Sequence, residues 1–235
     1  GPGYTALHAV TWVRKSGGGD NDPSPQGSGS MASLEFVKKL IASGANPNAR
    51  MTKPVKSGLT SLNTLGATPF LLASRTGDAE LMRTLAKLGA DPLLPNADNS
   101  SPLIVAAGLG TRSPGEDAGE ESEVVEAVKV ALELGNDINA VDNNGETAMH
   151  GAAYKNLPAV VELLAARGAD IKVWNHKNKH GWTPLTIAEG YRFGNFKPSS
   201  VTIAAFHRVM QAAGVSPVAT PPPASSANSN YKKTP

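Results

Sequence analysis

The stretch Asp142-Asn143-Asn144-Gly145-Glu146-Thr147-Ala148-Met149-His150-Gly151-Ala152-Ala153 decides the fold of this 235-residue chain. It opens a unit that continues to Gly168-Ala169-Asp170 and closes at Trp174, so the unit covers 142–174, which is 33 residues. Two anchors define this unit, the threonine at 147 and the glycine at 168. Self-similarity with a period of about 20 to 50 residues is typical of repeat architectures.

Both anchors recur in order five times. The first anchor stands at Thr5, Thr68, Ser101, Thr147 and Thr183, and the closing glycine stands at Gly44, Gly89, Gly135, Gly168 and Gly214. The anchors are 21 residues apart in the second and fourth units. They are 39, 34 and 31 residues apart in the first, third and fifth units, which therefore carry insertions of 18, 13 and 10 residues.

The residue types at these positions predict two short helices in each unit. Threonine or serine before a helix can accept a hydrogen bond from the free amides of its first turn. Pro69, Pro102 and Pro184 follow this residue and suit the first helical position, which needs no amide donor. A glycine after the second helix can end it in the left-handed conformation. Small residues such as Ala73 and Ala152 let the helices of neighbouring units approach closely.

This pattern resembles the ankyrin repeat family, over about residues 3–215. The matching segments are 3–9, 66–73, 101–107, 145–153 and 181–188, together with Gly44-Ala45-Asn46, Gly89-Ala90-Asp91, Gly135-Asn136-Asp137 and Gly168-Ala169-Asp170. The resemblance implies an all-α solenoid of stacked helix-turn-helix units joined by β-hairpin-like loops. It also implies that the chain binds another protein and catalyses no reaction.

We expect one repeat domain over 1–216 and a tail over 217–235 that is rich in Pro, Ser and Asn and therefore disordered or extended. The five units cover about 1–50, 63–95, 96–141, 142–174 and 178–216. The inserted loops are 15–32, 51–62, 111–123 and 193–202. Those of the first, third and fifth units are expected between the two helices, where they either are tolerated surface loops or form a second contact surface on one edge.

The insertion 111–123 is acidic, with Glu116, Asp117, Glu120, Glu121 and Glu123. It lacks the alternating ligands and central glycine of a calcium-binding loop, so we expect no metal there. The interpretation is a solvated acidic loop or one that meets a basic partner.

The resemblance implies a concave groove lined by the hairpin tips and the first helices. Carried onto this sequence, the exposed groove positions are Tyr4, Trp12, Arg14, Arg75, Asp98, Tyr154, Lys155, His180, Trp182, Tyr191 and Arg192. Tyr, Trp and Arg dominate the energetics of protein interfaces, which makes these residues candidate partner contacts. The alternative is that several of them, notably Trp12 and Tyr191, only pack the inserted loops.

The composition excludes several classes of function. The chain has no cysteine, so disulfides, zinc–cysteine sites and thiol catalysis are absent. Its formal net charge is +2, which favours neither nucleic acid nor an anionic membrane as a partner, and no apolar run could span a bilayer. Nucleotide-binding and nucleophile motifs are absent. We therefore expect no enzyme and no cofactor.

Histidine offers no metal site either. His8 and His150 stand at the same position of the unit and are expected to satisfy backbone groups between hairpins. His176 and His180 are four residues apart, but their neighbours indicate a loop rather than a chelating helix.

The first unit is expected to lack a polar cap, so that Leu7, Val10 and Phe36 face no preceding unit. We therefore expect an upstream segment or a partner subunit to cover this edge. The chain opens on Gly1 rather than methionine, which indicates a processed start or a piece of a longer chain. Together with the absence of cysteine, this start favours an exported or periplasmic protein over a cytoplasmic one by a small margin.

Three functions stay open at this point. The first is a non-catalytic scaffold or an accessory subunit of a larger assembly, which binds a partner through the concave groove and the inserted loops. The second is an adaptor module of a longer enzyme or redox chain. The third is a carbohydrate or small-ligand binder that uses Trp12, Trp174 and Trp182 as stacking platforms.

Overall fold

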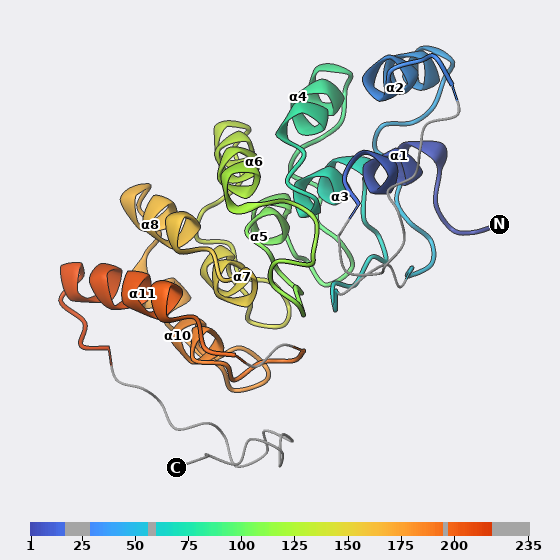
Figure 1. Ribbon diagram of the computed structural model, residues 1–235. Helices are drawn as coiled ribbons and strands as arrows, with labels where there is room; N and C mark the ends of the chain where they lie inside the picture. Colours follow the sequence, from blue (N-terminus) through green and yellow to red (C-terminus); the bar gives the residue numbers. More distant parts are fainter. Residues whose placement is uncertain (17–28, 56–59, 195–196, 218–235) are drawn as a thin grey trace.

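The computed structural model describes residues 1–16, 29–55, 60–194 and 197–217, and these residues form a helical solenoid (Figure 1). Their eleven helices are α1 (Ala6–Arg14), α2 (Ser33–Ala42), α3 (Pro69–Arg75), α4 (Ala79–Lys87), α5 (Pro102–Ala106), α6 (Glu121–Glu133), α7 (Ala148–Lys155), α8 (Pro158–Ala166), α9 (Ile171–Trp174), α10 (Pro184–Ala188) and α11 (Ser200–Ala212). The expected tail, except for residue 217, and parts of three inserted loops lie outside the described residues.

The helices form two layers that follow one curve (Figure 1). An inner layer of α1, α3, α5, α7 and α10 lies on the concave side, and each of these helices packs on the next. The outer layer holds α2, α4, α6, α8 and α11, and the prediction of an all-α solenoid of helical pairs is confirmed. No helix in the described part is long and apolar enough to cross a membrane.

The first anchor of each unit caps an inner helix, as predicted. The side chains of Thr68, Ser101 and Thr183 accept from the backbone N–H three residues later. Thr5 and Thr147 instead share a capping box with His8 and His150. Pro69, Pro102 and Pro184 occupy the first turns of their helices, where a missing N–H costs no hydrogen bond.

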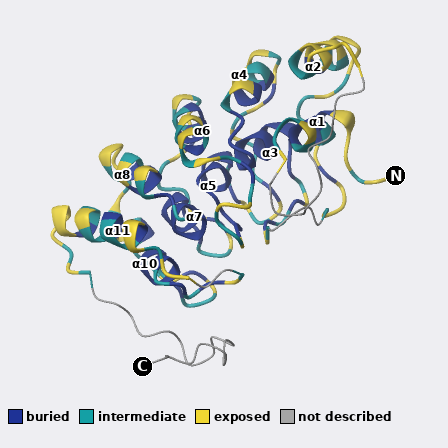
Figure 2. Cartoon of the chain, in the orientation of Figure 1, coloured by how far each residue is buried: buried dark blue, intermediate teal, exposed yellow. Residues whose placement is uncertain are grey.

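The closing glycines end the outer helices in the left-handed region, which a side chain resists. Their φ values lie between 72° and 94° at Gly44, Gly89, Gly135, Gly168 and Gly214. The core lies between the two helix layers (Figure 2). Ala106 and Ala152 of the inner helices are fully buried, and the apolar stripe of the outer helices, for example Val160, Val161 and Leu164, closes the core.

The loops that join consecutive units form fingers stacked by single hydrogen bonds. Each finger donates one backbone N–H to the previous segment at 2.8–2.9 Å, and the pairs are Thr52 to Gly3, Ala97 to Leu65, Asn143 to Asp98 and Lys179 to Asn144. The described residues form no regular strand, and the one isolated bridge among them joins Thr60 to Thr111.

A repeated Asx turn shapes three of the fingers. The side-chain oxygens of Asn96, Asp142 and Asn178 each accept from the backbone N–H groups two and four residues later, at 2.8–3.1 Å. Such side-chain bonds replace the backbone bonds of a tight turn. The remaining polar atom of each side chain bonds to the preceding finger. The fingers are therefore fixed relative to one another by side chains as well as by the backbone.

The acidic insertion folds back on the inner helices. Asp117 pairs with Arg75 of α3, and the Ala118 carbonyl accepts from Lys155 of α7. Ser61, in the long finger before α3, donates its N–H to Gly110 at 2.8 Å. The insertion is therefore not a solvated loop at Asp117, which meets a basic residue of its own chain, whereas Glu116 and Glu120 are exposed.

The first unit differs from the expectation in part. Leu7 and Val10 are buried, because α1 packs on both α2 and α3, so these two side chains are not left open at the edge that has no preceding unit. Phe36 stays 41% exposed, and Val13 of α1 is 52% exposed. The first unit therefore presents apolar side chains, although not all of those predicted.

Candidate protein-binding groove

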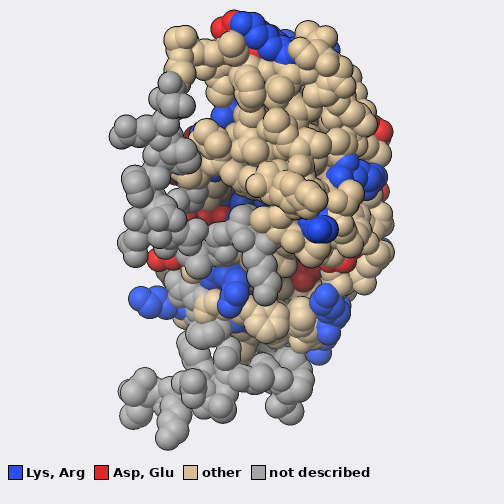
Figure 3. Space-filling model, turned by 90° about the vertical axis from the view of Figure 1, so that its right-hand side faces the viewer, with Lys and Arg blue, Asp and Glu red and all other residues tan. Residues whose placement is uncertain are grey.

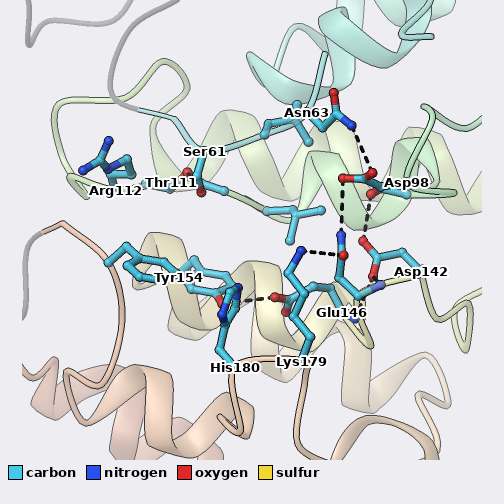
Figure 4. Close-up of a pocket in the computed structure, with 16 residues that line it drawn as sticks. Ser61, Asn63, Asp98, Thr111, Arg112, Asp142, Glu146, Tyr154, Lys179 and His180 are labelled. Atoms are coloured by element: carbon cyan, nitrogen blue, oxygen red, sulfur yellow. Dashed lines mark hydrogen bonds between the residues drawn. The ribbon is translucent and has the colours of Figure 1, made fainter. Parts of the chain in front are cut away.

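A pocket of about 120 Å³ lies on the concave side, between the fingers and the inner helices (Figure 4). Its lining comes from four fingers, from α7 and from the segments that follow α5 and α10. The polar and charged side chains of its lining include Asn63, Asp98, Arg112, Asp142, Asn144, Glu146, Tyr154, Lys179 and His180. Figure 3 shows acidic and basic side chains together in the hollow of the face that it presents.

Side-chain amides, rather than basic side chains, hold the carboxylate of Asp98. Asp98 accepts from the side-chain amide of Asn63 at 3.0 Å and from that of Asn144 at 3.3 Å. Asp142 is held by backbone N–H groups and by the Ser100 hydroxyl at 2.8 Å. The negative charges of both residues are thus oriented without being paired to a basic side chain.

Glu146 is the most unusual group in the pocket. It is only 5% exposed, and its Oε1 accepts from the Tyr154 hydroxyl at 3.1 Å and from the Asn178 amide at 2.8 Å. Its Oε2 is buried and has no hydrogen-bond partner. Burial, with a smaller effect of the Asp142 charge, raises the pKa of Glu146 to about 8. Burial also raises the pKa of Tyr154.

Two basic residues border the pocket without pairing with these acids. Lys179 donates its ammonium to the Asn144 amide oxygen at 2.6 Å. Arg112 is exposed and lies at the opposite end of the pocket from Asp98 and Asp142 (Figure 4). Within the described ranges, no ion pair involves Asp98, Asp142 or Glu146.

Aromatic rings form one side of the pocket mouth. The rings of His180, Trp182 and Phe193 contact one another with centroids 5.0 Å apart in each pair. Trp182 is buried, whereas Phe193 is 48% exposed. Burial and the nearby Lys179 charge lower the pKa of His180, so its ring is neutral near pH 7.

Comparison with known proteins shows which family the sequence resembles. The family model for ankyrin repeats matches residues 118–196 in three copies. The E3 ubiquitin-protein ligase KEG of Arabidopsis thaliana is 29% identical over 151 residues, which is 62% of this chain and 8% of that protein. The NF-kappa-B inhibitor alpha of Sus scrofa is 29% identical over 124 residues, or 52% of this chain and 37% of that protein. A putative ankyrin repeat protein of fowlpox virus is 43% identical over 51 residues, or 22% of this chain and 12% of that protein.

The chain contains ankyrin repeats, which the family model matches over residues 118–196. Ankyrin repeats are in general non-catalytic modules for protein–protein interaction, and the pocket described above is lined both by the repeats and by their inserted loops. The matched segments span between 8% and 37% of these three relatives, so the relatives' own activities are not carried over.

Three of the eleven predicted contact residues meet in this ankyrin groove, namely Asp98, Tyr154 and His180. At the first repeat, Tyr4 and Trp12 stack edge to face with centroids 5.0 Å apart. Tyr191 is half-buried against the core. Whether any of these residues contacts a partner stays a prediction.

The prediction that all eleven side chains are exposed is wrong for five of them. The buried residues are Arg75, Tyr154, Lys155, Trp182 and Arg192. Three are cationic, and each is used inside the chain: Arg75 by Asp117, Lys155 by the Ala118 carbonyl, and Arg192 by the Ala153 and Tyr154 carbonyls. Burial lowers the pKa of Lys155 to about 8 and that of Arg192 to about 10.

Arg14 is also occupied by its own chain. Its guanidinium donates to Asp78 at 2.6 Å, to Glu80 at 3.1 Å and to Ser33 at 2.6 Å, so it ties α1 to the start of α4. The hydrogen bond with Asp78 raises the pKa of Arg14. The guanidinium therefore joins two repeats instead of standing free in the groove.

The tryptophans do not form an open stacking platform. Trp174 packs against Phe206 and is buried, and Trp182 is buried as well. Only Trp12 is partly exposed, so the carbohydrate-binding hypothesis loses the aligned open indoles on which it depended.

The groove also contains residues that the sequence reasoning missed, above all Asn63, Asp142, Glu146 and Asn178. A signal for three of them was present. Asn63, Asp142 and Asn178 each precede a helix-capping anchor by five residues, at the position that forms the Asx turn in the third to fifth repeats. No comparable spacing marks Glu146.

Proposed function

We propose that this chain is a non-catalytic scaffold that binds a partner protein through its concave groove and inserted loops, as an accessory subunit of a larger assembly. The observation that carries this proposal is the pocket between the fingers, whose carboxylates have no basic partner among the described side chains. Buried polar groups in folded proteins are almost always hydrogen-bonded, so an open set of oriented acceptors favours an external donor.

The exposed aromatic side chains support the same proposal. Phe193 at the pocket mouth and Tyr4 at the first repeat are both more than one-third exposed. Aromatic side chains are enriched in protein interfaces, where they bury large areas at low entropic cost. Ankyrin repeats as modules point to a protein as the partner.

Site-specific photo-cross-linking tests the proposal. A benzoylphenylalanine placed at Phe193 in the groove is compared with one placed at Val201, which is 61% exposed on the outer helix α11. After irradiation in the native cell, we expect a defined protein adduct from position 193 and none from position 201. Equal adducts from both positions, or none from position 193, would contradict a binding groove.

A second contact belongs to the same proposal. Val13 and Phe36 of the first repeat, together with Met31, are exposed apolar side chains. We propose that an upstream segment or a partner subunit covers them, because exposed apolar clusters commonly mark interaction sites. If benzoylphenylalanine at position 36 gives no cross-linked adduct in the assembled protein, this part of the proposal is contradicted.

An adaptor module within a longer enzyme is the second candidate. The observation that favours it is that the match to the E3 ligase KEG occupies only 8% of that protein. The test is the full open reading frame: a catalytic domain encoded in the same chain supports the adaptor, and its absence supports the separate scaffold.

A further inference from the structure

We propose that the pocket between the fingers receives one arginine side chain of the partner. This inference rests on the proposed function and makes it specific, since it names the chemical group that enters the groove. The pocket places Asp98, Asp142 and Glu146 around a space of about 120 Å³ that opens beside the exposed ring of Phe193.

Charge is the first argument. Elsewhere in the described part of the chain, recessed carboxylates find a basic partner: Asp78 pairs with Arg14, and Asp117 pairs with Arg75. The three acids of the pocket accept only from amide, hydroxyl and backbone groups. Those neutral donors orient the acids but leave the negative charges of Asp98 and Asp142 without an ion-pair partner, which suits a cationic ligand.

The unpartnered oxygen of Glu146 is the second and independent argument. Both donors in reach, Tyr154 and Asn178, are directed to Oε1, and they fix the side chain. Oε2 is left buried without a hydrogen-bond partner, which costs free energy until a ligand supplies one. A guanidinium carries five N–H donors and no acceptor, so it can satisfy Oε2 and a neighbouring carboxylate together.

The shape of the pocket favours a side-chain head group rather than a metal ion or a folded element. No group of three or more His, Asp or Glu residues in the described part of the chain could hold a metal ion. A protein cavity of roughly 150 Å³ binds benzene, so a space of about 120 Å³ suits a group of similar size or slightly smaller. A guanidinium with its adjoining methylene falls in that range.

The aromatic wall favours arginine over lysine. Phe193 stands with His180 and Trp182 in one cluster and keeps an exposed face at the pocket. Guanidinium groups stack on aromatic faces more readily than ammonium groups, and they match carboxylates in a planar fork. The ammonium group of Lys179 lies close to the acids, but it is already hydrogen-bonded to Asn144.

The proton state of Glu146 gives the inference a distinctive readout. With a pKa of about 8 in the free protein, this carboxyl carries a proton at pH 7, and an incoming guanidinium would displace it. The other titratable or charged groups that line the pocket or act on this carboxyl and its partner are Asp98, Arg112, Asp142, Tyr154, Lys179, His180 and Arg192. We expect binding to release a proton at pH 7 and to release none at pH 9.

The experiment titrates the blocked peptide acetyl-Gly-Arg-Gly-amide into the full chain by calorimetry, in buffers of low and high ionisation enthalpy. The matched peptides carry citrulline, which keeps the shape without the charge, or lysine. We expect the arginine peptide to bind in the millimolar range, the citrulline peptide at least about tenfold more weakly, and the lysine peptide between them.

Variants locate the site. Glu146→Gln keeps an oxygen for Tyr154 and Asn178 but removes the charge, and we expect it to weaken the arginine peptide about tenfold and to abolish the proton release. Asp98→Asn should weaken binding without changing the proton release. The control Glu116→Gln, in an exposed part of the acidic insertion, should change neither. Thermal unfolding of each variant confirms that it is folded.

Several outcomes would overturn the inference: no binding of the arginine peptide, equal binding of the citrulline or lysine peptide, or equal loss in the Glu116→Gln control. Binding without proton release at pH 7 would also contradict it. A failure here is distinguishable from failure of the proposed function, because the cross-linking at positions 193 and 201 does not depend on which side chain enters the pocket.

Discussion

Arg75 and Asp117 form an ion pair that is buried on both sides: the guanidinium nitrogen lies 2.6 Å from the carboxylate oxygen, and the two side chains are 8% and 7% exposed. Asp117 belongs to the acidic insertion of the third repeat, and Arg75 ends α3 of the second repeat. The insertion is therefore held against the inner helices, next to the groove that it borders.

We predict that Asp117→Ala lowers the free energy of unfolding by about 3 kcal/mol, because it leaves a buried guanidinium unpaired. The double variant Arg75→Met/Asp117→Ala should cost less than the sum of the two single changes, because it also removes the unpaired charge. Urea unfolding of the four proteins of this cycle measures the coupling.

The exposed pair of Arg208 with Glu162 is the matched control for this cycle, since both side chains are at least half exposed. Glu162→Ala should cost no more than about 1 kcal/mol. Similar costs for the exposed and the buried pair would show that the insertion is not anchored by Arg75.

Glu146 makes the free energy of unfolding fall as the pH rises from 4.5 to 8. Its pKa is about 8 in the folded protein and near 4.5 in the unfolded chain. The unfolded state therefore loses this proton first as the pH rises, so the stabilising contribution is complete below pH 4.5, falls between pH 4.5 and 8, and is constant above. We predict that the free energy of unfolding of the wild type falls by a few kcal/mol relative to that of Glu146→Gln between pH 4.5 and 8.

Denaturant midpoints of wild type and Glu146→Gln, measured at steps from pH 4.5 to 9, check this prediction. The exposed Glu116→Gln substitution serves as control and should run parallel to wild type. Parallel curves for Glu146→Gln and wild type would contradict the buried, protonated carboxyl.

His150 acts in the opposite direction, on the acidic side. Its Nδ1 contacts the backbone N–H and the hydroxyl of Thr147, and its Nε2 lies 3.2 Å from the His176 carbonyl. Burial lowers the pKa of His150 to about 3, so the folded state keeps it neutral while the unfolded chain takes up a proton near pH 6.5. Its contribution is complete above pH 6.5 and is lost as the pH falls toward 3.

We predict that His150→Gln costs about 1–2 kcal/mol at pH 7, through the lost capping bonds, and that the difference disappears or reverses at pH 4, where wild type has lost about 3 kcal/mol. Chemical unfolding at the two pH values measures both numbers. A gap for His150→Gln that widens in acid would be inconsistent with a neutral buried ring.

The sequence predicts the helical pairs well because the signals for them are local. A cap such as Thr68 and a closing glycine such as Gly89 act within one turn of their own helix, so the same residue types reappear at each boundary. The prediction that His8 and His150 satisfy backbone groups is confirmed for the same reason, since each ring bonds to its own cap and to one neighbouring carbonyl.

The groove is predicted less well because its surface is set by contacts between distant segments. Lys155 occupies an exposed position if α7 is considered alone, yet the insertion covers it and the Ala118 carbonyl accepts from its ammonium, 37 residues away. Arg192 is likewise buried, and its guanidinium donates to the Ala153 and Tyr154 carbonyls of α7, 39 and 38 residues away. Helical periodicity carries no information about where an inserted loop returns, so these cationic residues are placed wrongly from sequence.

Gly151 shows how closely the third and fourth repeats approach each other. It lies within α7, and a Cβ there would stand 2.9 Å from the Ile104 carbonyl oxygen and 3.1 Å from the carbonyl carbon of Ala107, both of the preceding repeat. Gly151→Ala should therefore lower the free energy of unfolding by about 1–3 kcal/mol through overpacking, although alanine favours a helix by about 1 kcal/mol. The reverse change Ala166→Gly at the exposed end of α8 measures the helix term alone and should cost up to about 1 kcal/mol. If Gly151→Ala instead raises the free energy of unfolding by the helix-propensity gain of alanine, the contact between α5 and α7 is looser than these distances require.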